Sequence, residues 1–241
     1  MPEAASKAFW DELHRLGKPE YRLDKVLFRD IFARIVRPGM SCFEVGCYPG
    51  RYMVYLAREH GCHVSGIDYT SEFERMWALF REWQVRPLDL YQGDFLAFNP
   101  SKQYDFVYSL GFVEHFSELD EVLARHVRLV RPGGWLFIAA PNFRRVQYVL
   151  RRWLDPADLD RHCLATMDLG WWRQILTRLG MRVVFDGYYK TFGFWVSTQP
   201  SSCMGRRIVR FLKGFGEWVS ARVDLPNRWT SPYLISVSQK V

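Results

Sequence analysis

The segment that ends at Gly50 combines an acidic side chain with two glycines, a pattern suited to binding a small charged ligand. Glu44, just before a turn, could accept hydrogen bonds from a cationic ammonium group. Gly46 can adopt a positive φ and let the backbone approach a ligand closely, and Gly50 opens a helix whose free N–H groups form a positive end. Cys47 and Tyr48 lie between the glycines and are further candidates. The alternative is a tight strand-to-helix turn with no ligand.

Two further acidic residues follow predicted strands. Asp68 ends one strand, with Tyr69 beside it, and is placed to accept hydrogen bonds from both hydroxyls of a ribose. Asp94 could accept from an adenine amino group, while Phe95 supplies a backbone N–H and ring packing. Leu110, at the carboxyl end of the fourth predicted strand, can contact an amino-acid part of the same ligand. The alternatives are that Asp68 caps the next helix and that Asp94 belongs to an ordinary turn.

These residues need an alternating series of strands and helices to bring them together. Apolar runs predict strands over 41–45, 63–67, 89–92, 104–109, 135–140, 181–185 and 233–238, and helical spacing predicts helices over 51–60, 71–83, 118–130 and 168–179. Such alternation with short links favours a mostly parallel sheet covered by helices on both faces. Ligands on such sheets bind at the carboxyl ends of the strands, where the candidate residues lie.

The chain divides into two parts on this pattern. Residues 1–40 are predicted to form an N-terminal helical cap, since apolar residues between 7 and 36 recur at helical spacing. Residues 41–241 are predicted to form one α/β domain with additions at 141–167 and 187–230, the second inserted before the last strand.

Taken together, the four motifs resemble the class I S-adenosylmethionine-dependent methyltransferase family, most clearly over residues 40–140. The resemblance implies a Rossmann-like seven-stranded, mostly parallel sheet and S-adenosyl-L-methionine as the cofactor. It also implies that Glu44 and Gly46 lie near the methionine moiety, Asp68 on the ribose and Asp94 on the adenine. One position departs from the family, because Tyr48 stands where the middle glycine of its glycine-rich turn is usual.

Within that family, the segments 112–116 and 140–142 are similar to those of small-molecule and glycan O-methyltransferases. His115 follows the fourth strand, where a neutral imidazole could take the proton of a hydroxyl as the methyl group transfers. Glu114 could orient that ring, and Asn142 and His162 are further candidates for contacts with the acceptor. The alternatives are that His115 only packs or caps a helix and that His162 is exposed on the surface. In-line methyl transfer needs no covalent enzyme intermediate, so orientation can supply most of the acceleration.

Composition limits the partners, the localisation and the cysteine chemistry that we expect. The net charge of +7 favours acidic partners such as nucleic acid, an anionic membrane surface or a phosphorylated substrate. No apolar run is long enough to span a bilayer, and the first residues contain no apolar signal core, so we expect a cytoplasmic protein. The five cysteines, at 42, 47, 62, 163 and 203, form no C-x-x-C pair, so we expect neither disulfides nor a bound metal.

A basic amphipathic stretch lies within the second addition. Seven apolar residues between 204 and 219 fall on one predicted helical face, and Arg206, Arg207, Arg210 and Lys213 fall opposite. Residues 204–222 could therefore make a peripheral contact with a membrane, near a lipid-linked substrate. The alternative is a helix that packs on the sheet or on a second subunit.

The function predicted from the sequence is methyl transfer to a hydroxyl of a small molecule, a sugar or a lipid-linked glycan. An RNA methyltransferase is a less favoured alternative, supported by the positive charge, and N-methylation of a small amine is another. The fourth strand ends in Ser109-Leu110-Gly111-Phe112 and lacks the Asn/Asp-Pro-Pro-Tyr motif of enzymes that methylate base amino groups. A nicotinamide dehydrogenase would need G-x-G-x-x-G and no acid at Glu44. The sequence says nothing about the oligomeric state.

Overall fold

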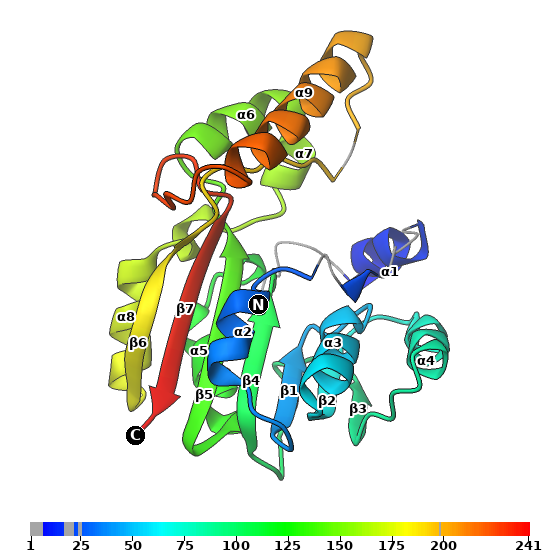
Figure 1. The fold of residues 1–241 in the computed structure, drawn as a ribbon, viewed down its shortest axis with the longest axis vertical. Coiled ribbons are helices and arrows are strands. Elements are labelled where there is room, and N and C mark those ends of the chain that lie inside the picture. Colours follow the sequence, from blue (N-terminus) through cyan, green and yellow to red (C-terminus); the bar gives the residue numbers. More distant parts are fainter. Residues whose placement is uncertain (1–6, 17–21, 24–25, 198) are drawn as a thin grey trace.

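A seven-stranded sheet forms the centre of the protein (Figure 1). The computed structural model describes residues 7–16, 22–23, 26–197 and 199–241, so parts of the predicted cap (1–6, 17–21 and 24–25) and residue 198 of the second addition lie outside it. The strands are β1 (Ser41–Val45), β2 (His63–Asp68), β3 (Asp89–Gln92), β4 (Tyr104–Leu110), β5 (Val130–Pro141), β6 (Met181–Tyr189) and β7 (Tyr233–Lys240). Their order is β3-β2-β1-β4-β5-β7-β6, and only β7 runs antiparallel to its neighbours. The predicted Rossmann-like fold class is confirmed.

Helices cover both faces of the sheet. One face packs against α2 (Arg29–Ile35), α3 (Arg51–His60) and α4 (Phe73–Glu82), and the other against α5 (Leu119–Leu129) and α8 (Leu169–Arg178). The α1 helix (Lys7–Leu16) lies beyond the sheet, near the carboxyl ends of the first strands (Figure 1). The buried faces of these helices follow the apolar spacing of the sequence, which is why their positions were predictable.

Five of the seven strands are longer than the sequence predicts, and β5 and β6 differ most from the prediction. β5 begins at Val130 rather than at Trp135, because the segment Arg131–Gly134 continues the strand. A Cβ on Gly134 would lie 3.0 Å from the carbonyl oxygens of Tyr104 and Arg131, so this glycine permits a close backbone approach. β6 continues to Tyr189, paired with β7, so the second addition begins after the predicted residue 187.

The additions form a separate layer beyond the carboxyl end of β5 (Figure 1). It contains α6 (Val146–Leu154), α7 (Pro156–Leu159), the 3₁₀ turn η3 (Leu164–Thr166) and α9 (Cys203–Ser220). A small apolar core joins α6 to α9, with Leu154, Phe192, Phe194 and Val209 buried in it. None of the helices in the described ranges has both the length and the apolar character that crossing a bilayer requires.

The predicted apolar face of α9 is only partly buried. Ile208, Leu212 and Val219 pack into the small core with α6, whereas four other apolar side chains of the same helix remain exposed. The exposed four are Met204, Phe211, Phe215 and Trp218. Because α9 packs on its neighbours through only part of its apolar surface, an apolar ridge remains exposed on the same helix as the basic residues.

Candidate functional site: two adjoining cavities

A cavity of about 820 Å³ opens at the carboxyl ends of β1, β2, β3 and β4. We call it the first cavity. Seven of the ten predicted cofactor residues line it: Gly46, Tyr48, Asp68, Tyr69, Asp94, Phe95 and Leu110. The structure thus gathers the predicted set at the edge of the sheet where ligands of such folds bind.

The other three predicted residues, Glu44, Cys47 and Gly50, lie behind the wall of the first cavity. Glu44 is buried and accepts a hydrogen bond of 3.1 Å from the Tyr108 hydroxyl, and burial raises the pKa of its carboxyl well above the usual range. Cys47 is buried, and Gly50 precedes α3 with φ +94°. A Cβ on Gly50 would lie 2.9 Å from the ring of Phe80, so this glycine also serves packing.

The turn after β1 approaches the cavity closely. Gly46 has φ +71°, and a Cβ there would lie 2.8 Å from the ring of Phe112, itself part of the cavity wall. The Gly46 and Cys47 N–H groups both donate to the carbonyl of Ile67, which ties this turn to the end of β2. A side chain at position 46 would therefore disturb both the turn and the cavity.

Asp68 is held in place by the backbone around it. One carboxylate oxygen accepts from the N–H of Tyr48 and the other from the N–H of Thr70, each at 2.8 Å. Burial raises the pKa of Asp68, although these hydrogen bonds oppose the shift. Because α4 begins only at Phe73, Asp68 is not its cap. Asp94 lines the cavity and also accepts from the N–H of Leu96 at 2.8 Å, so it makes the turn contact as well.

The α1 helix supplies two wall residues that sequence reasoning missed, Trp10 and His14. The His14 ring stacks on Tyr48 with centroids 4.0 Å apart, and the Tyr48 hydroxyl donates to the His14 carbonyl at 3.2 Å. Burial lowers the pKa of His14 to about 4, so the ring is neutral at neutral pH. The sequence held one indication of such a contact, namely Tyr48 at a position where glycine is usual, because an added ring there needs another side chain to cover it.

A second cavity, of about 840 Å³, adjoins the first through shared wall residues: Trp10, Leu110, Gly111 and His115. Glu114 and His162 line it too. Asn142 does not. This residue is buried, and its amide donates to the Ser231 carbonyl at 2.8 Å, so it ties β5 to the segment before β7. Three of the four predicted acceptor-side residues therefore meet in one cavity.

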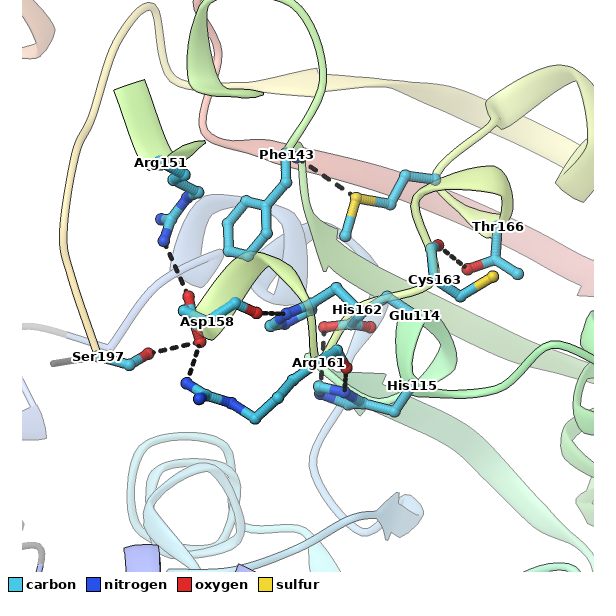
Figure 2. Close-up of polar contacts among 11 residues, drawn as sticks. Glu114, His115, Phe143, Arg151, Asp158, Arg161, His162, Cys163, Thr166 and Ser197 are labelled. Atoms are coloured by element: carbon cyan, nitrogen blue, oxygen red, sulfur yellow. Dashed lines mark hydrogen bonds and ion pairs between the residues drawn. The ribbon is translucent and has the colours of Figure 1, made fainter. Parts of the chain in front are cut away.

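Glu114 and His115 lie in a 3₁₀ turn, η2 (Val113–His115), and approach His162 after α7 (Figure 2). The Glu114 Oε1 and His115 Nε2 atoms are 3.9 Å apart, and the rings of His115 and His162 have centroids 4.6 Å apart. Burial lowers the pKa of His115 to about 3 and raises that of Glu114 to about 8. Both groups are thus uncharged near neutral pH, and the predicted role of His115 as a base stays a prediction.

A buried ion pair supports this side of the second cavity. Arg151, which is fully buried in α6, donates to Asp158 at 2.9 Å, and its guanidinium lies 3.5 Å from the centre of the Phe143 ring. Arg161 and Ser197 also donate to Asp158, at 2.9 and 2.8 Å (Figure 2). The sequence did not predict this group, because the spacing of Arg151 and Asp158 does not distinguish them from charged residues that are exposed on the surface.

Comparison with known proteins places this geometry in a family. Residues 18–184, more than half of the chain, match the family model described as a methyltransferase domain. A ubiquinone biosynthesis O-methyltransferase of Thiobacillus denitrificans is 28% identical over 59% of this chain and 61% of its own length. The enzyme of the same name from Klebsiella pneumoniae is 31% identical over 58% of each chain. The chain therefore spans about three-fifths of the length of these curated relatives.

Solved structures share the fold. A SAM-dependent methyltransferase from Archaeoglobus fulgidus superposes with a TM-score of 0.58 at 18% identity, over 88% of this chain and 90% of that one. Phosphoethanolamine N-methyltransferase 2 of Haemonchus contortus, in complex with S-adenosylhomocysteine, gives 0.59 at 14% identity over 88% and 51% of the two chains.

The residues around the first cavity fit an adenosyl sulfonium compound. Asp68 offers a carboxylate beside the turn after β1, Asp94 offers a second next to β3, and the rings of Phe95 and Phe112 supply apolar surface for a base. The glycine at position 46 leaves the room that a bound ligand needs. The chain belongs to the class I methyltransferase family, whose cofactor is S-adenosyl-L-methionine.

Proposed function

We propose that this protein transfers a methyl group from S-adenosylmethionine to a hydroxyl of a small organic acceptor in the second cavity. The observation that carries the proposal is the shared wall, because His115 and Leu110 border both cavities. An acceptor in one cavity and a cofactor in the other would meet there. When bound, the cofactor supplies an electrophilic methyl group on a cationic sulfur.

The chain's own residues would orient the acceptor. The second cavity is lined by aromatic side chains, among them Phe28, Phe143, Trp195 and Tyr233, which suit a flat or apolar molecule. His115 would receive the acceptor hydroxyl at Nε2, because its Nδ1 already faces the Arg161 carbonyl at 3.1 Å. Orientation of this kind accounts for much of the acceleration in group transfer.

The curated relatives support a hydroxyl over an amine as the acceptor group. Those cited above carry the name O-methyltransferase, although each match covers only part of either chain. An amine acceptor remains the competing outcome, since a structural neighbour is an N-methyltransferase.

A transfer assay tests this proposal. The protein is incubated with S-adenosylmethionine labelled in the methyl group and with matched aromatic acceptors that carry a phenol, a catechol or an amine. We expect label in the hydroxylated compounds and S-adenosylhomocysteine as the second product. Label found only in the amines would show that the acceptor group is an amine and not a hydroxyl. Calorimetry that detects no S-adenosylhomocysteine binding would overturn the proposal as a whole.

We also propose that α9 holds the protein at an anionic lipid surface, close to a lipid-linked acceptor. Phe211, Phe215 and Trp218 are exposed and stack in sequence along the helix. Exposed basic residues accompany them on the same helix: Arg206, Arg207, Arg210 and Lys213. A helix that carries both exposed apolar rings and exposed cationic side chains suits the boundary between acyl chains and anionic headgroups.

Liposome sedimentation tests the proposed contact between α9 and lipid. We expect the protein to sediment with vesicles of phosphatidylglycerol, much less with phosphatidylcholine alone, and less still after Phe211→Ser together with Trp218→Ser. The exposed variant Trp77→Ser, on α4, serves as the matched control. Unchanged sedimentation in the α9 variant would exclude the ridge as a lipid contact. A concentration-dependent dimer lost in the same variant would assign it to a second copy instead.

A further inference from the structure

The second cavity brings together three groups that commonly bind metal ions. One ligand atom from each of Glu114, His115 and His162 lies within 4.8 Å of the other two. The spacing of these residues in the sequence does not reveal the cluster, because His162 is far from the other two in the chain and reaches them only through the addition that contains α7 (Figure 2).

Both histidines are oriented in the way that metal ligands usually are. The Nδ1 atom of His115 faces the Arg161 carbonyl at 3.1 Å, and that of His162 faces the Asp158 carbonyl at 2.7 Å. A carbonyl oxygen only accepts hydrogen bonds, so each neutral ring carries its proton on Nδ1. The Nε2 lone pairs are then left free. Backbone carbonyls fix the tautomer of zinc-bound histidines in the same manner.

Glu114 is a buried carboxyl that lacks a full set of partners. It is 1% exposed, and its Oε2 atom makes no hydrogen bond to any part of the chain that the structure describes. Burying such a group without a partner costs free energy. A cation between Glu114 and the two imidazoles would compensate for it.

The nearby arginines do not occupy this position. Arg151 and Arg161 both direct their guanidinium groups to Asp158, which also accepts from the Ser197 hydroxyl. Asp158 is therefore committed to these three donors, and its negative charge offsets part of the positive charge of the arginines. The carboxylate left for a cation is that of Glu114.

We infer that Glu114, His115 and His162 bind one divalent transition-metal cation at the wall of the second cavity. Two imidazoles and one carboxylate suit zinc, and also manganese, iron or cobalt. Bonds to such ions are about 2.0–2.2 Å long, so the side chains would move closer together by roughly 1 Å on binding. Three protein ligands leave a coordination position open, and the cavity gives a small molecule access to it.

The further role of this cation rests on the proposed function. With the cation bound to His115 Nε2, a hydroxyl oxygen of the acceptor would take the open coordination position instead of bonding directly to that nitrogen, and a cation there favours the deprotonated form of the hydroxyl. Binding of the ion itself is independent of that step, so the two are tested separately.

Metal binding is measured on tag-free protein that has been treated with a chelator and dialysed. Zinc chloride is titrated by calorimetry, and metal content after desalting is determined by mass spectrometry. We expect about one zinc per chain and a loss of affinity of at least tenfold in both Glu114→Gln and His162→Asn, because each removes a ligand. Cobalt(II) chloride should give a visible absorption band that zinc displaces.

Two controls make the result decisive. His63→Ala removes an exposed histidine outside the cluster and should leave zinc affinity unchanged. S-adenosylhomocysteine affinity should stay near that of the wild type in His162→Asn, which shows that the variant is folded. The inference is overturned if zinc binds far below one per chain, or if Glu114→Gln and His162→Asn bind it as the wild type does. Zinc binding without methyl transfer would support this site and contradict the proposed function. Methyl transfer by a protein that binds no zinc would support the proposed function and contradict this site.

Discussion

The first cavity is assembled from the ends of neighbouring strands, whereas the second takes its wall from segments far apart in the chain. Asp68 is the last residue of β2, and Asp94 lies two residues after the end of β3. His115 and His162, by contrast, meet only because the layer with α6 and α7 packs over the end of β5. The difference teaches that the two cavities should respond separately to mutation: changes in the first should alter cofactor affinity, and changes in the second should alter turnover or stability.

Replacing His115 gives the largest expected effect. His115→Ala should lower kcat by about 10²–10⁴-fold, because an oriented polar group is lost where the cavities meet. Steady-state assays measure the rate, and calorimetry should find S-adenosylhomocysteine affinity little changed. A rate near that of the wild type would show that His115 only packs. It would also contradict the expectation that changes in the second cavity alter turnover.

The buried ion pair tests how the second cavity is supported. Arg151→Leu should lower the free energy of unfolding by about 3–5 kcal/mol, because it leaves the Asp158 carboxylate buried with one partner fewer. Urea unfolding measures this. The exposed pair of Arg178 with Asp120 is the control, and Arg178→Leu should cost no more than about 1 kcal/mol. Equal losses in the two variants would mean that burial of Arg151 adds nothing.

Asp68 tests the first cavity. Asp68→Ala should weaken S-adenosylhomocysteine binding by about 1–3 kcal/mol, since a buried hydrogen-bond acceptor is removed. Calorimetry compares it with Asp89→Ala, which alters an acid at the opposite end of β3, paired with Lys102. Unchanged affinity in Asp68→Ala would remove this residue from the cofactor site.

The smallest effect is a pH dependence of the same binding. Burial raises the pKa of Asp68, so in the free protein the carboxyl takes up a proton at a higher pH than an exposed aspartate does. A ligand whose hydroxyls donate to the carboxylate favours the ionised form. Affinity for S-adenosylhomocysteine should therefore fall as the pH drops through the raised pKa, and calorimetry at several pH values would measure it. A pH profile that is the same in Asp68→Asn would assign the dependence to another group.

The sequence predicted the strands and the first cavity well because both follow from local patterns. The bounds of β3 agree with the prediction, and seven predicted cofactor residues share one cavity. Prediction failed where a residue's role depends on distant packing. The segment before Trp135 has the sequence of a turn, yet it belongs to β5 as an irregular stretch between two residues that pair with β4, Val130 and Trp135. The α9 helix divides its apolar residues between a core and an exposed ridge.

By itself the sequence determined the order of strands and helices and the acids that end them, since apolar periodicity and glycine turns act over a few residues. Only the tertiary structure decided that Trp10 and His14 cover the first cavity, and that His162 joins Glu114 and His115. The reason is physical. A side chain's neighbours across a cavity depend on how whole layers pack against each other, and no local spacing in the chain encodes that packing.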